Sequence, residues 1–433
     1  MPRTDCILTP KKPINGRLLS APWLGGRVLV ACLLATGTAH AELTDMQPLL
    51  LEDAIQWTLQ KHPELASFAH RRDALQGQVQ QAQIRRRPEL DVDLQDGLGT
   101  GRRTGFGQVQ STLSISWILE GELVAASVEA AQVKIAQVDG ERTIRALNVA
   151  AETAALFVQD LARQARIELA RQSVEQAEDA LSVARRREAA GSGATMEVLQ
   201  AQAELQARQL EVDVLTHELE AGRYQLAAQW GGDRIYRPDG DLHLLPSVGD
   251  LDQQRSLLKN SPLLHPYVTR QRIAESEMML ARIEAKPRWQ FSTGLRRYED
   301  ADDFALVAGL SIPLGKDRRS TGRLRTLRGQ QAQDAAEADA LERRMDSQLY
   351  ELLLELEHGL HVIEALTDGI LPTLEEAHRQ ARQAYEIGQL SYLQWHDLRR
   401  QWLAARHNLI ATYEATHLRH IELQRLVGAS LTQ

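Results

Sequence analysis

The stretch Glu89-Leu90-Asp91-Val92-Asp93-Leu94-Gln95 alternates strictly between polar and apolar side chains. A β-strand has a side-chain period of two, so this stretch predicts a strand with one apolar face and one acidic face. Residues 109–117 alternate in the same way, with Val109, Leu113, Ile115 and Trp117 set against Gln108, Gln110, Thr112, Ser114 and Ser116. Together the two segments predict a hairpin over residues 88–118.

The same pattern returns in the second half of the chain and predicts a second hairpin over residues 287–314. Its apolar positions are Trp289, Phe291, Leu295, Phe304, Leu306, Ala308, Leu310, Ile312 and Leu314. Strands of membrane barrels have about 9–11 residues and alternate between lipid-facing and lumen-facing positions. Val92 and Leu310 are therefore expected to face lipid, whereas Asp93 and Ser311 are expected to face a lumen. Four strands cannot close a barrel, since the smallest barrels have about 8, and open edges are not tolerated in lipid. A membrane-spanning barrel would have to be shared between copies of the chain.

Matching residues about two hundred positions apart indicate a duplicated half-molecule. Pro88 matches Pro287 at an offset of 199, and Gly191 matches Gly388 at an offset of 197. The two-residue difference falls in the turns between the strands, 97–107 and 298–303, where changes of length are best tolerated. The period is too long for a solenoid repeat.

Long helices are predicted outside the strands, because no proline occurs between Pro88 and Pro238. The expected segments are N-terminal helices at 42–87, a long helical hairpin at 119–230, a linker at 231–249, second-repeat helices at 250–286 and a second long hairpin at 315–433. Gly369 and Pro372 should kink the last of these. The fold class is mainly α with a small β part: long coiled-coil helical hairpins plus four transmembrane β-strands per chain.

The return helix of the first hairpin carries two apolar seams at heptad spacing. One contains Ala203, Ala207, Leu210, Val214, Ala221, Tyr224 and Ala228, and the other contains Leu205, Val212, Leu215, Leu219 and Leu226. Two seams fit a closed ring of helices, in which each helix has a neighbour on both sides. They fit a plain helical bundle equally well.

Residues 1–41 have the pattern of a secretory signal peptide: a basic region ending at Arg27, an apolar run and a cleavage site at Ala39-His40-Ala41. The basic region is long, so the true start codon can lie downstream of Met1. A lipoprotein box ending at Cys32 is a second interpretation. Both cysteines, Cys6 and Cys32, lie in this segment, so cleavage after Ala41 leaves no thiol for a disulfide, a metal site or catalysis.

Charge and motifs argue against several functions. The net charge of the 433 residues is −8, and the signal segment is basic, so the remainder is more acidic still and does not favour nucleic acid. No motif for nucleotide binding, hydrolysis or zinc catalysis occurs in a usable context. The pairs His358/His361 and His417/His420 have no carboxylate or thiol to complete a metal site. No cofactor, no metal site and no catalytic residue are predicted.

The chain resembles the TolC-like outer membrane efflux factors over nearly all of its mature length. The resemblance rests on His62-Pro63-Glu64-Leu65, on Ser311-Ile312-Pro313-Leu314-Gly315 and on the segment from Tyr385 to Leu393, which follows the family pattern Tyr-x-x-Gly-x-x-Ser. The stretch from His62 to Leu90 looks most like the heavy-metal (cobalt–zinc–cadmium) branch.

This resemblance implies a homotrimer whose twelve strands form a barrel in the lipid of a Gram-negative outer membrane, with helices extending into the periplasm. It implies an exit duct, not an enzyme, for metal ions or small toxic compounds, as in heavy-metal resistance. It also implies a periplasmic adaptor (membrane fusion) protein and an inner-membrane pump of the RND type as partners. A periplasmic coiled-coil scaffold without a pore is the alternative.

The resemblance also assigns site residues at the two hairpin tips. Gly191, Ser192, Gly193, Gly388, Leu390 and Ser391 are expected to contact the adaptor or the pump. The family's two gating acids correspond to Gln394 and Asp397, of which only Asp397 is acidic, and Glu197 is the acid at the first tip. Asp397 would narrow the periplasmic end, or it is a solvated charge near a helix start.

Overall fold

The computed structural model describes residues 47–232, 236–247, 249–314 and 319–431. Contacts divide the chain into residues 1–45 and 46–433, and the structure below concerns the second unit. The expected signal peptide, with Cys6 and Cys32, lies outside the described residues.

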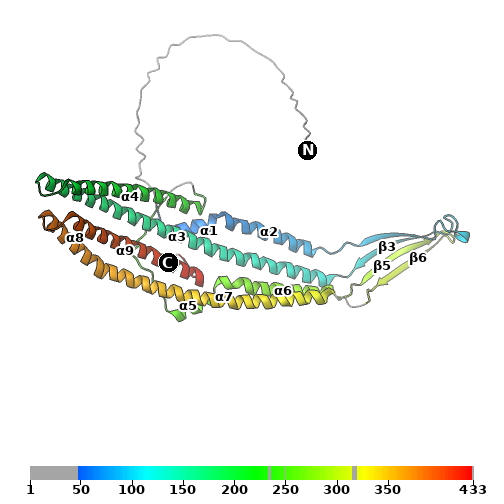
Figure 1. Ribbon diagram of the computed structural model, residues 1–433. Coiled ribbons are helices and arrows are strands. Elements are labelled where there is room, and N and C mark those ends of the chain that lie inside the picture. Colours follow the sequence, from blue (N-terminus) through cyan, green and yellow to red (C-terminus); the bar gives the residue numbers. More distant parts are fainter. Residues whose placement is uncertain (1–46, 233–235, 248, 315–318, 432–433) are drawn as a thin grey trace, which may run out of the picture. The chain divides into compact units, whose positions relative to one another are not determined.

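The first half of the unit runs from two helices through a β-hairpin into a long helical hairpin (Figure 1). A two-residue strand, β1, precedes the first helix. The elements in order are β1 (Pro48–Leu49), α1 (Leu51–Lys61), α2 (Pro63–Gln83), β2 (Glu89–Gln95), a 3₁₀ turn (Gly101–Arg103), β3 (Gln110–Ile118), α3 (Gly121–Ala189) and α4 (Thr195–Ala228).

The second half repeats this plan after a linker that contains β4 (Arg237–Pro238), which pairs in parallel with β1. Its elements are α5 (Leu251–Leu258), a 3₁₀ turn (Pro262–Leu264), α6 (His265–Glu284), β5 (Gln290–Tyr298), β6 (Asp303–Ser311), α7 (Arg319–Glu364), a π-helical turn (Ala365–Ile370), α8 (Leu371–Glu386) and α9 (Tyr392–Val427). The π-helical turn lies directly before Pro372, where the sequence predicted an interruption. The prediction of a mainly helical chain with a small β part is confirmed.

Equivalent helix starts in the two halves use the same capping device. The His62 imidazole Nδ1 accepts a hydrogen bond from the Glu64 amide, with Pro63 as the first helical residue. The Ser261 hydroxyl accepts from the Leu263 amide at 3.3 Å, with Pro262 in the matching place. Proline suits the first turn because its missing N–H would have no helical partner there.

Helix α2 ends at Gln83, four residues before the Arg87 that the helical pattern suggested. Residues 84–88 are neither helix nor strand. The physical reason lies in Pro88, because a proline disfavours helical geometry in the residue before it. The chain therefore leaves the helix early and reaches β2 in a non-helical segment that carries Arg85, Arg86 and Arg87.

Helix α3 has 69 residues, about 100 Å at ~1.5 Å per residue, and it packs against α2, α4, α6 and α9. Alanines along it, among them Ala150, Ala154 and Ala162, are buried in a cluster with Trp402, Leu403 and Ile410 of α9. Of the two seams on α4, the one with Leu219 and Leu226 is buried or half-buried. The seam from Ala203 to Ala228 is exposed along its whole length.

The four long strands form one antiparallel sheet in the order β2-β3-β5-β6. The central β3–β5 pair joins the two halves of the chain, and its register places Leu113 beside Leu295. Val92 pairs with Leu113, and Leu295 pairs with Leu306, so these four residues make one apolar row. The neighbouring row is polar at three of its four positions and consists of Asp93, Thr112, Arg296 and Ala305.

The apolar face of this sheet is exposed, and the centre of its polar face is covered. Leu90, Val92, Leu94 and Leu306 are each more than 65% exposed, whereas the polar Thr112 and Ser116 on the other face are buried. A water-soluble antiparallel sheet buries its apolar face and exposes its polar face. This sheet therefore has the burial pattern of a protein whose apolar face contacts something other than water.

Gly294 lies where two strands approach each other closely. A Cβ at this position would lie 2.4 Å from the Leu113 carbonyl oxygen and 2.7 Å from the Ser114 Cα. We predict that Gly294→Val lowers the free energy of unfolding by about 1–3 kcal/mol, the usual cost of overpacking. Thermal or denaturant unfolding measures this change. Gly107→Val, in the loop of the first hairpin with no atom within 4 Å, is the matched control. Equal unfolding of both variants would contradict the prediction.

Candidate functional site: the hairpin tips and the groove between the return helices

The two hairpin tips end their long helices in the same way. Gly191 and Gly388 have φ values of 71° and 81°, the left-handed conformation that glycine adopts without a steric penalty. In the first tip the amides of Ser192 and Gly193 donate to the Arg187 carbonyl. In the second, the amides of Gln389 and Leu390 donate to the Ala384 carbonyl. These bonds satisfy carbonyls that the helix end leaves free.

Arg187, in the last turn of α3, connects the first tip to the second. Its guanidinium donates to the backbone carbonyl of Tyr385 on α8 and, at 2.9 Å, to that of Ser192. The same guanidinium lies 4.5 Å from the centre of the Tyr385 ring, within cation–π range. One side chain therefore holds backbone from both hairpins.

An aromatic cluster fills the space behind the tips. Tyr385, Tyr392 and Trp395 are buried, and the Tyr385 and Trp395 rings stack at 5.0 Å. The Tyr385 hydroxyl donates to the Glu197 carboxylate of α4 at 2.9 Å. Burial, and then the hydrogen bond to Glu197, raise the pKa of Tyr385, so the hydroxyl keeps its proton and remains a donor. This contact is a second link between the two hairpins.

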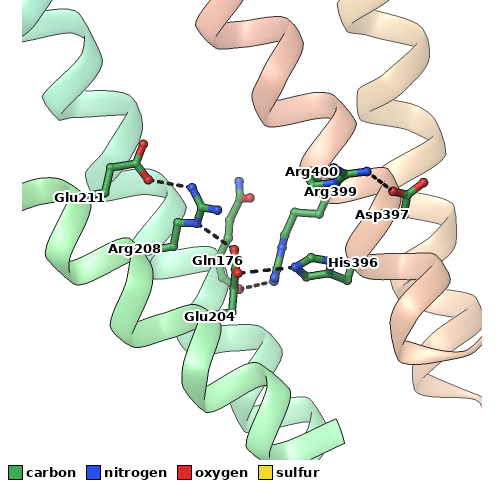
Figure 2. Close-up of polar contacts among 8 residues, drawn as sticks. All are labelled: Gln176, Glu204, Arg208, Glu211, His396, Asp397, Arg399 and Arg400. Carbon is green, nitrogen blue, oxygen red and sulfur yellow. Dashed lines mark hydrogen bonds and ion pairs between the residues drawn. The ribbon is translucent and has the colours of Figure 1, made fainter.

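The predicted gate residues occupy three different environments. The Asp397 carboxylate accepts from Arg400 at 2.8 Å (Figure 2) and from Gln401 at 2.7 Å. These hydrogen bonds lower the pKa of Asp397. The Gln394 side chain accepts from the amide and hydroxyl of Ser391, which forms a capping box at the start of α9. Glu197 binds Tyr385 instead. Among the described residues, no hydrogen bond or ion pair joins Glu197 to Asp397.

A polar groove of about 290 Å³ lies between the return helices α4 and α9. Arg208 of α4 donates to Glu204 at 2.8 Å and to Glu211 at 2.7 Å, so it lies between two carboxylates of its own helix. Each carboxylate also faces a histidine of α9. His396 lies 3.6 Å from Glu204, and His407 lies 3.9 Å from Glu211. Figure 2 shows Arg208, Glu204 and His396 pointing toward one another across the groove.

One carboxylate and one imidazole of this groove have shifted pKa values. The contact with His396 and the hydrogen bond from Arg208 outweigh burial and lower the pKa of Glu204 to about 2. Burial lowers the pKa of the His407 imidazole, and Arg208 and Arg166 lower it further by repulsion. At neutral pH the groove therefore contains an ionised Glu204 and a neutral His407.

Neither the tips nor the groove contain a candidate metal site in the described part of the chain. No three His, Cys, Asp or Glu side chains gather there in a way that could hold a metal ion. Of the histidine pairs noted in the sequence, His417 contacts the Leu242 carbonyl of the linker at 2.8 Å. The His420 imidazole is largely buried, and burial lowers its pKa.

Sequence reasoning missed the residues that join the hairpins. Arg187 aligns with Ala384 in the repeat, so the duplication gives no signal for it. Tyr385 was part of the tip motif, but its partner Glu197 is distant in sequence. The spacing of Glu204, Arg208 and Glu211, four and three residues apart, was a readable signal for an ion-paired helix face.

The sheet has an exposed apolar face, and its strands lead into paired helical hairpins. This combination defines a class of channel-forming membrane protein. No helix in the described ranges is both long and apolar enough to cross a membrane.

Comparison with known proteins agrees with this class. Residues 54–232 match the family model described as outer membrane efflux protein. The cobalt-zinc-cadmium resistance protein CzcC of Cupriavidus metallidurans is 27% identical over 88% of this chain and 90% of its own length. The nickel-cobalt-cadmium resistance protein NccC of Alcaligenes xylosoxydans xylosoxydans is 27% identical over 72% of this chain and 69% of its own. The crystal structure of the outer membrane protein VceC of Vibrio cholerae matches with a TM-score of 0.71, 18% identity and coverage of 88% and 97%.

Over residues 54–232 the chain thus matches the outer membrane efflux proteins, and it is similar to CzcC over most of its length. It is an efflux channel of the Gram-negative outer membrane, a transport protein and not an enzyme. The resemblance predicted from His62-Pro63 and the tip motif is thus confirmed.

The shifted pKa of Glu204 gives a prediction about pH. A carboxylate whose pKa falls from 4.5 to about 2 on folding stabilises the fold above pH 4.5, and this contribution is lost as the pH falls toward 2. We expect Glu204→Gln to lower the thermal unfolding midpoint at pH 7, with a difference from wild type that shrinks steadily below pH 4.5. Glu218→Gln, at an exposed position of the same helix, is the control. A difference that is as large at pH 3 as at pH 7 would contradict this assignment.

Proposed function

We propose that this chain is the exit duct of a tripartite efflux system and works as a homotrimer. Three copies would supply twelve strands to one barrel in the outer membrane, and their helices would extend into the periplasm. The observation that carries this proposal is the sheet β2-β3-β5-β6, which has free edges at β2 and β6 and an exposed apolar face. Free edges in lipid leave backbone groups without partners, so neighbouring copies must pair with them.

The exposed seam on α4 supports the same assembly. Leu210 and Tyr224 are more than 60% exposed, although they lie at heptad spacing on a helix that already packs against α3 through its other seam. A helix with one satisfied and one free seam fits the edge of a protomer in a closed ring. A periplasmic scaffold without a pore would leave the apolar face of the sheet in water.

Metal ions are the substrates we propose. The relatives CzcC and NccC are named for resistance to cobalt, zinc, cadmium and nickel, and each aligns with more than two thirds of this chain. A passive duct selects weakly, so an inner-membrane pump of the RND type would set the specificity. Deletion of the gene should sensitise the host to these metals, and re-expression should restore resistance.

The hairpin tips are the proposed contact site for the periplasmic adaptor. Gly191, Ser192, Gly388 and Ser391 are exposed there, with Leu390 partly covered beside them. Gly193 completes the first tip. Large apolar side chains next to these turns are also exposed, which is typical of a protein-binding surface: Met196, Leu199, Ile387 and Leu393.

The faces of the sheet should differ in their tolerance of charge. Val92→Arg and Leu310→Arg would place a cation in lipid, which costs about 2–4 kcal/mol at mid-membrane depth, and much less in a lumen. Asp93→Arg and Ser311→Arg lie on the polar face and are the matched controls. Folding into vesicles and trimer recovery in detergent measure the effect. Equal loss of folding and trimer recovery in all four variants would contradict the channel proposal. A monodisperse monomer that needs no detergent would contradict it as well.

We also propose that Asp397 lines the periplasmic gate, with Gln394 and Glu197 nearby. Asp397→Ala would leave Arg400 without its carboxylate, so a ring of three acids would become a ring of three cations. Single-channel conductance in planar bilayers should rise, and block by multivalent cations should weaken. Asp339→Ala is the matched control, because Asp339 pairs with Arg343 at the same 2.8 Å on the body of α7. Unchanged conductance and block in an intact trimer would make Asp397 a surface charge.

A further inference from the structure

Each layer of the structure has one edge from the first half of the chain and one edge from the second half. The sheet runs from β2 to β6. The helices nearest the sheet pack in the order α2-α3-α6-α7, and those that reach the tips pack in the order α4-α3-α9, followed by α7 and α8. In Figure 1, α3 and α9 lie between α4 and α7. A head-to-tail ring of copies therefore joins the first-half edge of one copy to the second-half edge of the next.

Tyr224 is an exposed aromatic residue on the first-half edge, with 70% of its surface accessible. Leu219 and Leu226 of the same helix are buried, and Tyr224 lies five residues after the first and two before the second. At 3.6 residues per turn, the Tyr224 side chain leaves the helix about 140–160° away from both. Its ring therefore lies on the face of α4 that is turned away from the packed side of the helix.

A pocket of about 340 Å³ lies on the second-half edge, where the start of α5 meets α7. Most of its walls are apolar side chains: Leu251, Tyr350, Leu353, Leu354 and Leu360. Leu354 is 48% exposed. It lies five residues after Leu349 and two before Leu356, which are buried in the cluster shared with α9. By the same helical geometry, Leu354 faces about 140–160° away from this cluster, toward the free side of α7.

The exposed ring and the pocket lie at the same distance from the hairpin tips. The two tips are level with each other, because the Arg187 guanidinium donates to the carbonyls of both Ser192 and Tyr385. Tyr224 follows Gly191 of the first tip by 33 residues, and Leu354 precedes Gly388 of the second tip by 34 residues. At ~1.5 Å per residue, both lie about 50 Å from the tips. Tyr224 and the pocket thus occupy opposite edges of one copy at one level.

We propose that the Tyr224 ring of one copy fills the pocket between α5 and α7 of the neighbouring copy. This inference rests on the proposed homotrimer and names the contact that joins its helices. A tyrosine suits this pocket because its ring buries a large apolar area while its hydroxyl still needs a partner. Glu357, whose side chain lines the pocket, offers a carboxylate acceptor for that hydroxyl. The contact occurs three times in a closed trimer.

Cysteine cross-linking tests this contact in the full-length protein. Both cysteines of the sequence, Cys6 and Cys32, lie in the expected signal peptide, so its cleavage leaves introduced cysteines as the only thiols. Tyr224→Cys/Leu354→Cys is treated in isolated membranes with a short thiol-reactive cross-linker. We expect covalent dimers and trimers as the main products on denaturing gels. The two positions lie on opposite edges of one chain, so each cross-link must join two chains.

Tyr224→Cys/Ile370→Cys is the matched control. Ile370 is also exposed on the second-half edge, but it lies sixteen residues nearer the tip than Leu354. This separation is about 24 Å along the helix, so the control should remain monomeric on the same gels. Wild type, treated in parallel, should give no covalent oligomer.

The aromatic ring itself is tested by replacement. Tyr224→Ala should lower the temperature at which the trimer dissociates in detergent, and Tyr224→Phe should lower it less, because the phenylalanine ring still fills the pocket. An equal decrease in both variants would contradict the role of the ring.

Native mass measurement in detergent separates this inference from the proposed function. An intact trimer in which the Tyr224–Leu354 pair cross-links no better than the control would overturn the inference alone. Cross-linking of Leu354→Cys to a co-expressed adaptor instead of a second copy would overturn it as well. A wild-type protein that is monomeric in detergent would refute both the homotrimer and this contact.

Discussion

The pairing of β3 with β5 is the contact on which the rest of the architecture depends. It joins two duplicated halves, each with one hairpin, into a single sheet with one apolar face and one polar face. Two isolated hairpins would be marginal, since a two-stranded sheet has little stability on its own. Once the four strands are joined, two edges and an exposed apolar face remain. Lipid can cover the apolar face, and strands of neighbouring copies can pair with the two edges.

The helices, like the sheet, have an apolar surface that a single copy leaves uncovered. Helix α3 is covered on several sides by α2, α4, α6 and α9, and its many buried alanines allow close approach. Helix α4 has one buried seam, at Leu219 and Leu226, and one exposed seam that includes Leu210 and Tyr224. A single copy therefore ends in unsatisfied surfaces both in its strands and in its helices. Sheet and helices independently favour an assembly of several copies.

Much of the fold could be predicted from the sequence because its signals are periodic. The alternation around Val92 and Leu310 fixes strand faces, and the absence of proline between Pro88 and Pro238 permits the long helices. The early end of α2 was missed because the helical pattern continues through Arg85–Arg87, while Pro88 acts on the backbone before it. Periodicity also shows that α4 has two seams but not which one is buried. That choice depends on where α3 lies in space.

The site was less predictable because its contacts join distant residues. Nothing local marks Arg187 as the side chain that binds the Tyr385 carbonyl. The spacing Ser391-x-x-Gln394 is, by contrast, the local signature of the capping box at the start of α9. Pairings such as that of Arg187 depend on how two hairpins lie side by side. Sequence reasoning can name the tips from Gly191 and Gly388, whose conformation is local, but not the contacts between them.

The two ends of the molecule differ in how firmly the halves are joined. At the sheet, β3 and β5 are held by a continuous ladder of backbone hydrogen bonds, in which each bond supports its neighbours. At the tips, the halves are joined by a few side chains: Arg187, Glu197 and the aromatic cluster around Tyr385. Each such hydrogen bond contributes only about 0.5–1.5 kcal/mol, or somewhat more where a charge is involved. Each contact that joins the halves at the tips is therefore weak on its own, whereas the bonds of the sheet form one continuous ladder.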